Sequence, residues 1–191
     1  MSVLEVVEKF VSINGEGTKA GQLAVFIRFK GCNLNCKYCD TKWANEADAT
    51  AQQMTKEDIL EYVLSTGVKN VTLTGGEPLL RDGIEDVIEC LADNNLNVEI
   101  ETNGSIPLDN IRKLHKDNVT FTMDYKLSCS GMEQAMRLEN FSVLNKNDTV
   151  KFVAGCHEDL VRTKQIIEKY NLYGKCNLYI SPVFGMIEPE E

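Results

Sequence analysis

The 191-residue sequence lacks a long apolar run and lacks an excess of basic residues. Its longest apolar run, Leu23 to Ile27, is far shorter than the roughly 20 residues of a membrane-spanning helix. No basic segment followed by an apolar one opens the chain, so we expect a cytoplasmic protein with no membrane partner. Acidic residues outnumber basic ones by 29 to 20, which argues against a nucleic-acid partner because binding a polyanion requires a basic face.

Histidine is scarce as well, and the cysteines are odd in number. The only histidines are His115 and His157, and the seven cysteines include no second Cys-x2-Cys pair. An odd count in a cytoplasmic chain indicates free thiols or metal ligands rather than a disulfide framework. Length and composition otherwise fit one globular domain, residues 1–191. Pro182 to Glu191 resembles the acidic first turn of a helix without its body, so we expect the C-terminal end to be incomplete or frayed.

Beyond residue 22, short β-rich runs alternate with helical ones. Thr55 with Asp58 is a typical helix start, and apolar residues then recur at helical spacing in three stretches near Ile59, Ile84 and Leu160. The segments Ile111 to Leu114 and Met132 to Leu144 are weaker helix candidates. This alternation predicts parallel strands with right-handed crossovers, hence an α/β sheet or an open barrel. The expected strands are Ala24 to Lys30, Asn70 to Thr74, Asn97 to Thr102, Val119 to Tyr125, Thr149 to Ala154 and Asn177 to Ser181.

Polar or glycine-rich residues follow every one of these strands. Loops at the carboxyl ends of parallel strands converge on one rim, where α/β enzymes build their active sites. We therefore expect the six strand-end segments to form a single mouth, as in an enzyme.

Three cysteines are crowded into one of these segments, spaced Cys32-x3-Cys36-x2-Cys39. A structural zinc site requires a fourth ligand, which the scattered Cys90, Cys129, Cys156 and Cys176 do not obviously supply. A four-iron cluster with one iron open to an exchangeable ligand suits three cysteines better. Zinc and coincidence remain the alternatives.

Other strand-end residues permit a functional and an ordinary reading. In Thr74-Gly75-Gly76-Glu77-Pro78, the glycines allow close approach of a ligand and Glu77 offers a carboxylate to an ammonium group, or the segment is simply a tight turn. Asp40 and Thr41 are either a helix cap or, through the Thr41 hydroxyl, part of a magnesium site.

Two further strand regions carry charged or polar side chains that fit either a functional role in the mouth or an ordinary role at the surface. Arg28 lies in an apolar strand, so it either reaches solvent or meets a carboxylate in the mouth, and we favour the mouth. Lys126 and Ser128 are an ordinary surface pair or line the same mouth.

Together these motifs resemble the radical S-adenosylmethionine (SAM) superfamily. Ser12-Ile-Asn-Gly-Glu-Gly17, the segments from Ala24 to Thr41, Gly-Gly-Glu-Pro, Glu101-Thr-Asn-Gly104 and Asp124-Tyr-Lys narrow the resemblance to the family of 7-carboxy-7-deazaguanine synthases. The resemblance implies an open partial (β/α)6-type barrel, a modified radical SAM core. It also implies a carbon–nitrogen lyase that converts 6-carboxy-5,6,7,8-tetrahydropterin to 7-carboxy-7-deazaguanine with release of ammonia, in queuosine and 7-deazapurine biosynthesis.

The resemblance further implies a 4Fe-4S cluster, SAM and Mg2+ as cofactors, a one-electron reductant such as flavodoxin or ferredoxin, and a homodimer. By similarity the cluster is held by Cys32, Cys36 and Cys39, and Mg2+ by Thr41. SAM is contacted by Tyr38, Cys39, Asp40, Gly76, Glu77, Lys126 and Ser128. The pterin is contacted by Ile13, Asn14, Gly15, Arg28 and Thr74.

Two other functions share part of this pattern. A glycyl-radical-enzyme activase of the same superfamily would share the cysteines and Gly-Gly-Glu-Pro, but not the Ile-Asn-Gly-Glu-Gly stretch. A structural metal or electron-transfer module would share only the cysteines, and would leave the polar residues at the other strand ends unexplained.

Overall fold

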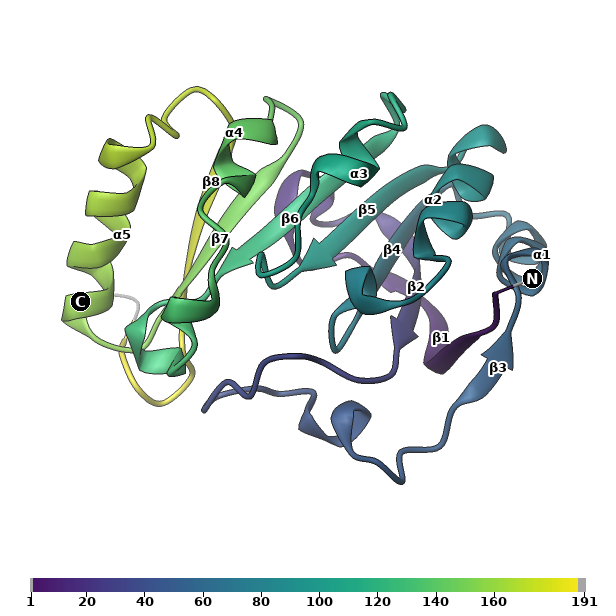
Figure 1. The fold of residues 1–191 in the computed structure, drawn as a ribbon, viewed down its shortest axis with the longest axis horizontal. Coiled ribbons are helices and arrows are strands. Elements are labelled where there is room, and N and C mark those ends of the chain that lie inside the picture. Colours follow the sequence, from purple (N-terminus) through teal and green to yellow (C-terminus); the bar gives the residue numbers. More distant parts are fainter. Residues whose placement is uncertain (1, 189–191) are drawn as a thin grey trace.

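The computed structural model describes residues 2–188, which form one eight-stranded sheet in the order β3-β1-β2-β4-β5-β6-β7-β8 (Figure 1). All neighbouring pairs from β2 to β8 are parallel, whereas β1 pairs antiparallel with both β2 and β3. The sheet does not close on itself, so the predicted open α/β architecture is confirmed. The strands are β1 (Leu4–Ile13), β2 (Leu23–Phe29), β3 (Gln52–Met54), β4 (Asn70–Gly75), β5 (Asn97–Thr102), β6 (Val119–Tyr125), β7 (Thr149–Ala154) and β8 (Asn177–Pro182).

The six predicted parallel strands agree with the structure to within one residue at each end. In β4, β5 and β6 apolar residues alternate with threonine or acidic residues, so the apolar side chains share one face of the sheet and enter the core. The two antiparallel strands were not predicted. Only the N-terminal residues of β1 are buried, Leu4 and Val6 at 2% exposure each, and a register shift interrupts its pairing after Val6, so the strand carries no sustained period-two pattern.

Within residues 2–188, three longer α-helices and two short ones connect the strands. The Thr55 hydroxyl accepts a hydrogen bond from the Asp58 amide and the Asp58 carboxylate accepts one from the Thr55 amide, so the predicted helix start is a capping box. Of the weaker candidates, the first is a single turn, α3, and Met132 to Leu144 is not one helix but contains a 3-10 turn and α4. The helices are α1 (Lys56–Thr66), α2 (Ile84–Asp93), α3 (Asp109–Arg112), α4 (Asn140–Val143) and α5 (His157–Lys169).

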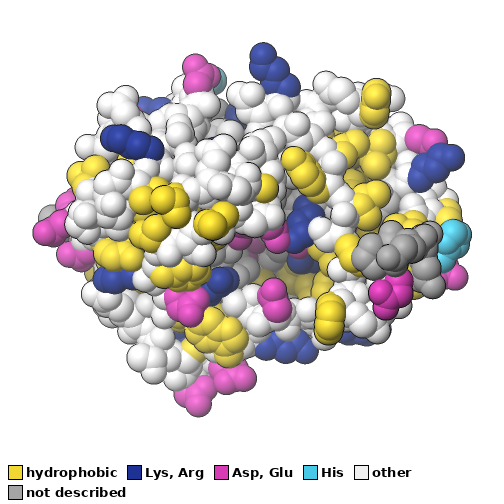
Figure 2. Space-filling model, turned by 180° about the vertical axis from the view of Figure 1, so that it is seen from behind, with side chains coloured by type: hydrophobic (Ala, Val, Ile, Leu, Met, Phe, Trp, Pro, Cys, Tyr) yellow, Lys and Arg dark blue, Asp and Glu magenta, His cyan; other side chains and the backbone are white. Residues whose placement is uncertain are grey.

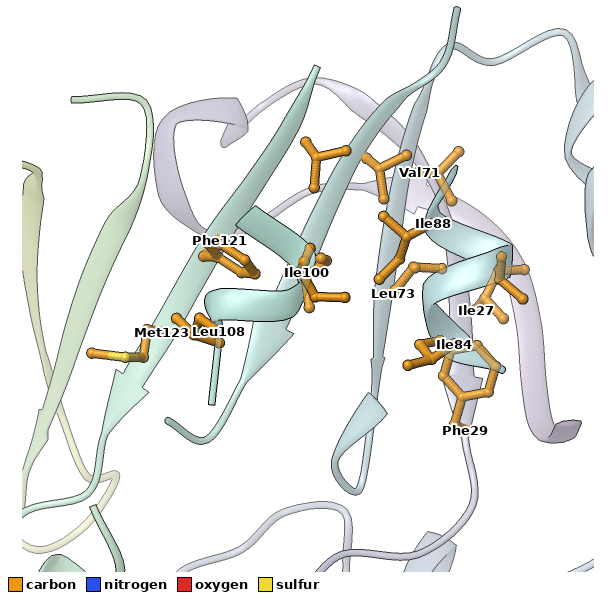
Figure 3. Packing of buried hydrophobic residues seen from close by; sticks show 14 of the residues in the cluster. Ile27, Phe29, Val71, Leu73, Ile84, Ile88, Ile100, Leu108, Phe121 and Met123 are labelled. Atoms are coloured by element: carbon orange, nitrogen blue, oxygen red, sulfur yellow. The ribbon is translucent and has the colours of Figure 1, made fainter. Parts of the chain in front are cut away.

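The core lies between the sheet and these helices. Figure 3 shows Ile84 and Ile88 of α2 directed toward Leu73 of β4 and Ile27 of β2. Leu73, Ile27 and Ile88 are fully buried, so truncating any of them to alanine removes about 2–5 kcal/mol of stability. This packing holds the parallel strands in place. The loops that follow their carboxyl ends therefore start from fixed positions.

The loop after β2 crosses the edge of the sheet where the parallel strands end (Figure 1). It docks against the turn after β4 through backbone hydrogen bonds from the Gly76 amide to the Phe29 carbonyl, 3.1 Å, and from the Glu77 amide to the Gly31 carbonyl, 3.0 Å. A Cβ at Gly76 would lie 2.0 Å from the Gly31 oxygen, so only glycine permits this approach.

At the other end of the sheet, β8 runs into a turn around Gly185. The acidic tail that resembles a helix start falls largely on residues 189–191, outside the described part of the chain. Within residues 2–188, no helix combines the length and the apolar character that a bilayer crossing demands.

Candidate active site

A cavity of about 1040 Å³ opens at the carboxyl ends of the parallel strands. Its lining includes residues from seven of the eight strands, among them Arg28, Thr74, Glu101, Asp124 and Lys151. Figure 2 shows the face opposite to that of Figure 1 hollowed near its centre, with acidic and basic side chains inside. The volume slightly exceeds the roughly 300–1,000 Å³ typical of ligand sites, which suits more than one small molecule. The predicted single mouth is therefore present.

The cavity brings together all but three of the predicted site residues. Ile13 is 65% exposed and is not part of its lining, and Glu77 and Ser128 turn their side chains to other partners. The predicted residues that line it are Asn14, Gly15, Arg28, Cys32, Cys36, Tyr38, Cys39, Asp40, Thr41, Thr74, Gly76 and Lys126.

The three clustered cysteines face the cavity as free thiols. Their sulfur atoms do not all lie within 4.8 Å of one another. Three thiolates on a single tetrahedral zinc, with Zn–S bonds of about 2.3 Å, would lie about 3.8 Å apart. This spacing favours a group with several metal atoms over a single ion.

The surroundings of these thiols also suit a metal cluster. Burial raises the pKa of Cys32 and of Cys36, so thiolates here need a compensating positive charge, which iron supplies. The Cys32 sulfur accepts hydrogen bonds from the Leu34 amide, 3.4 Å, and the Asn103 side-chain amide, 3.5 Å. Such N–H donors to ligand sulfurs are among the features that tune iron–sulfur clusters.

Glu77 holds the rim of the cavity together rather than facing its interior. Its carboxylate accepts hydrogen bonds from the Leu79 amide, the Thr102 hydroxyl and the Asn103 amide, at 3.1, 2.9 and 2.7 Å. Burial raises its pKa to about 7, although the Asn103 and Leu79 amides oppose that rise. Glu77 thus ties the turn after β4 to the end of β5, and Gly76 is left to face the cavity.

Asp40 and Thr41 place two hard oxygen donors side by side on the cavity wall. The Thr41 hydroxyl donates a 2.6 Å hydrogen bond to the Asp40 carboxylate, and both residues line the cavity. Oxygen atoms of this kind are the ligands that Mg2+ prefers, together with several waters. The residues present therefore fit a partly hydrated magnesium ion.

Arg28 meets a carboxylate in the mouth, as predicted. Its Nε donates a 2.9 Å hydrogen bond to Glu8 of the adjacent strand β1, and both residues line the cavity. Within residues 2–188 its two terminal nitrogens make no hydrogen bond, so they remain free to bind a carboxylate bidentately.

Lys126, directly after β6, and Tyr38, within the cysteine loop, both line the cavity. Lys126 donates a 2.7 Å hydrogen bond to Asp124, and although burial alone lowers the pKa of Lys126, this carboxylate raises it overall. The Tyr38 hydroxyl donates to the Val153 carbonyl at 3.3 Å. Ser128, by contrast, donates at 2.7 Å to buried Asp159, so its hydroxyl is directed away from the cavity.

Asn14 lies at the floor of the cavity with its side chain already engaged. Its amide nitrogen donates a 2.6 Å hydrogen bond to buried Glu99, and its amide oxygen accepts one from the Glu16 backbone. Its backbone amide donates to the Gln22 carbonyl and its carbonyl accepts from the Gly21 amide, so only the adjacent Gly15 is open to a ligand, since a Cβ there would meet no heavy atom within 4 Å. Asn14 thus shapes the floor through Glu99.

The predicted site residues leave out five charged residues of the lining, Glu8, Glu16, Glu101, Asp124 and Lys151. Burial raises the pKa of Glu101 to about 7, partly offset by a hydrogen bond with Thr74. Lys151 of β7 pairs with Glu16 across the cavity. The signal for Lys151 was present, because it is a charged residue within an apolar strand, as Arg28 is. Glu101 opens one of the strand-end motifs already noted.

Comparison with known proteins defines the class. A family model described as the Radical SAM superfamily matches residues 26–125, more than half of the chain, and covers the cysteines, the Gly-Gly-Glu-Pro turn and the strand that leads to Lys126. A crystal structure of QueE from Escherichia coli superimposes with a TM-score of 0.72 at 23% identity, over 95% of this chain and 85% of that one, which supports the same fold.

Two curated relatives then give the particular family. The 7-carboxy-7-deazaguanine synthase of Clostridium acetobutylicum is 60% identical over 97% of this chain and 84% of its own length. That of Chlorobaculum tepidum is 34% identical over 97% of this chain and 83% of its own. The chain belongs to the 7-carboxy-7-deazaguanine synthase family of radical SAM enzymes. Both the activase and the electron-transfer alternatives are thereby set aside.

Proposed function

We propose that this chain is a radical SAM lyase that converts 6-carboxy-5,6,7,8-tetrahydropterin to 7-carboxy-7-deazaguanine with loss of ammonia. The observation that carries the proposal is the single cavity in which Cys32, Cys36 and Cys39 share a wall with Arg28 and Thr41. When bound, the iron–sulfur cluster supplies the electron that cleaves the sulfonium of SAM and so starts radical chemistry on the substrate. The chain itself holds, orients and shields the reactants.

The cluster is assigned to Cys32, Cys36 and Cys39, and SAM to the wall beside them. Gly76 gives SAM close backbone approach, and Lys126 presents an ammonium group for its carboxylate. Tyr38 and Asp40 flank the same wall. Glu77 and Ser128, predicted as contacts, act here by positioning the loops that carry Gly76 and Lys126.

The pterin is assigned to the opposite side of the cavity. The free guanidinium fork of Arg28 suits the substrate carboxylate. Glu101, next to Thr74, offers a carboxylate acceptor to the N–H groups of the aminopyrimidine ring. Gly15 lines the floor beneath the ring, next to the buried Asn14. The site thus has a cationic end and an anionic end, which fixes the direction in which the pterin enters.

Magnesium is assigned to Thr41, where it would bind a second oxygen of the substrate carboxylate. We expect Thr41→Val to abolish the dependence of turnover on added Mg2+ and to raise the KM for the pterin, because it removes the hydroxyl oxygen but keeps the shape. Thr41→Ser restores the oxygen and is the matched control. If the two variants respond to Mg2+ in the same way, Thr41 does not hold the ion.

The remaining assignments concern partners. A one-electron reductant such as flavodoxin or ferredoxin, a homodimer, a cytoplasmic location and a place in queuosine biosynthesis are proposed from membership of the family.

The reaction is tested anaerobically with cluster-reconstituted protein, SAM, dithionite, Mg2+ and 6-carboxytetrahydropterin, with products followed by mass spectrometry. We expect 7-carboxy-7-deazaguanine and ammonia in equal amounts, without net consumption of SAM. Cleavage of SAM to 5′-deoxyadenosine and methionine without a deazapurine would overturn the substrate assignment. The matched control is the Cys32→Ala variant, which lacks one cluster ligand.

A further inference from the structure

A second group of thiols lies outside the cavity lining, where the loops after β6 and β7 meet. Cys129 follows β6, in the 3-10 turn Ser128–Ser130, and Cys156 is the N-cap residue of α5 directly after β7. The two sulfur atoms are 3.0 Å apart, with the Cys129 thiol donating a hydrogen bond to the Cys156 sulfur. Both residues are partly exposed, so small reagents can reach them.

The surrounding chain is built to bring these two sulfurs together. Asp159, fully buried in the first turn of α5, accepts hydrogen bonds from the Cys129 amide at 3.3 Å and from Ser128 at 2.7 Å through one oxygen. Its other oxygen accepts from the Gly155 amide at 2.9 Å. A Cβ at Gly155 would lie 2.9 Å from the Cβ of Cys129, so only glycine allows the loops to approach this closely.

A metal ion explains the arrangement less well than a dithiol does. The two thiols and Asp159 have ligand atoms within 4.8 Å of one another. Both carboxylate oxygens of Asp159 are already occupied by donors from the protein, however. Zinc bound by two thiolates would need two further ligands, and residues 2–188 bring no other histidine, cysteine or carboxylate into this group.

We propose that Cys129 and Cys156 form a redox-active dithiol that closes to an intrachain disulfide on reaction with a small-molecule disulfide. The Cys156 thiolate attacks one sulfur of the reagent, a sulfur–sulfur bond forms, and one reagent thiolate leaves. Cys129, losing its proton, then attacks the Cys156 sulfur and expels the second reagent thiolate. The protein dithiol loses two protons and two electrons, and the reagent is reduced to two thiols.

The order of attack follows from the hydrogen bond between the two thiols. Cys129 is the donor, and this contact, with burial and the neighbouring Asp159, raises its pKa to about 12. Cys156 is the acceptor in this contact, so its sulfur is the one of the pair that does not hold its proton in the hydrogen bond between them. Cys156 is therefore the attacking sulfur and Cys129 the resolving one.

Closure would tie together two loops that each reach the cavity wall. Lys126 lies three residues before Cys129, and Val153 lies three residues before Cys156, and both line the cavity. The disulfide, at about 2.05 Å between sulfurs, is shorter than the present contact and draws the loops together. Oxidation of the dithiol would therefore shift the part of the cavity wall that carries Lys126.

The test uses the cluster-loaded holoenzyme under anaerobic conditions, treated with oxidised glutathione, quenched with acid, alkylated and digested. We expect the peptides of Cys129 and Cys156 to lose alkylation together and to appear as one cross-linked species, while the iron content is unchanged. In Cys129→Ser, Cys156 should stop as a mixed disulfide with glutathione. In Cys156→Ser, Cys129 should stay reduced, because the attacking thiol is gone.

Cys90→Ser is the control, because Cys90 is a partly exposed single cysteine on α2 and its loss should leave the cross-link intact. Independent alkylation of Cys129 and Cys156 at every glutathione ratio would overturn the proposal. So would zinc that co-purifies with the holoenzyme and is lost in Cys129→Ser, since it would show a metal site instead. Neither readout depends on turnover of the pterin.

Discussion

At the scale of single residues, Arg28 in the cavity uses only part of its guanidinium group for contacts within the protein. The Nε atom of Arg28 donates a hydrogen bond to Glu8, and its two terminal nitrogens remain free. Glu8 thereby orients the fork and compensates part of its charge before any substrate arrives. Preorganisation of this kind reduces the ordering that substrate binding must bring about.

We expect Arg28→Lys to raise the KM for the pterin by about tenfold to a hundredfold, because an ammonium group cannot replace a bidentate, charge-assisted contact worth about 1.5–3 kcal/mol. Steady-state kinetics on the reconstituted enzyme would measure it. Arg137→Lys is the matched control, since Arg137 is exposed and lies outside the cavity. An unchanged KM would remove Arg28 from the substrate site.

Glu101 gives the site a pH dependence. Its pKa is raised by burial to about 7, so the carboxylate is charged above pH 7 and becomes neutral as the pH falls. We expect the KM for the pterin to rise about tenfold for each pH unit below 7, because the anionic acceptor is lost. Kinetics between pH 5.5 and 7.5 would measure this slope.

Glu101→Gln should show a KM that is high and nearly independent of pH over the same range. Glu61→Gln, an exposed residue of α1, should keep the slope of the parent protein. A parent enzyme without the slope, or a Glu101→Gln variant that retains it, would assign the titration to another group.

At the scale of elements, the cysteine loop depends on the turn after β4 for its shape. Backbone hydrogen bonds join Gly76 to Phe29 and Glu77 to Gly31, the residue before Cys32. Glu77 extends the same framework to β5 through the Asn103 amide, and Asn103 in turn donates to the Cys32 sulfur. The Gly-Gly-Glu-Pro turn is therefore part of the scaffold of the cluster loop.

We expect Gly76→Ala to cost about 1–3 kcal/mol of stability and to lower iron incorporation, because its Cβ would overlap the Gly31 carbonyl and displace the cysteine loop. Urea unfolding and iron content after reconstitution would measure the two effects. The control is Gly67→Ala, at the C-cap of α1 with φ 71° and no atom within 4 Å of its Cβ. That change should cost about 1 kcal/mol through backbone strain alone, with iron content unaffected.

At the scale of the whole molecule, the ligand site and the fold share the same loops. Seven strands deliver residues to one cavity, so a ligand that fills it bridges segments far apart in the sequence. Binding to the folded state alone must therefore stabilise the entire sheet, by mass action.

We expect SAM at about a hundred times its Kd to add about 2.7 kcal/mol, and so to raise the Tm of the cluster-loaded protein by about 5–10 °C. Anaerobic thermal unfolding would measure the shift. The Cys36→Ala variant, reconstituted in parallel, should show little shift because the cofactor loses its metal partner. Equal shifts in both proteins would place SAM elsewhere.

Much of the architecture was readable from local sequence. The six parallel strands, the capping box at Thr55 and the cysteine spacing depend on residues close together in the chain, so periodicity and motif found them. The antiparallel strand β1 was not predicted, because apolar and polar residues stop alternating after Val6. A strand in which only one end is buried carries too short a pattern to predict.

The sequence by itself determined the fold class, the spacing of the three clustered cysteines and the family, because these rest on local pattern and motif. Tertiary structure decided where individual side chains point. Glu77 turns to Thr102, Ser128 to Asp159 and Asn14 to Glu99, partners that lie 25 to 85 positions away. A buried polar group must satisfy its hydrogen bonds with whatever the fold brings near it, and only the folded chain determines those neighbours.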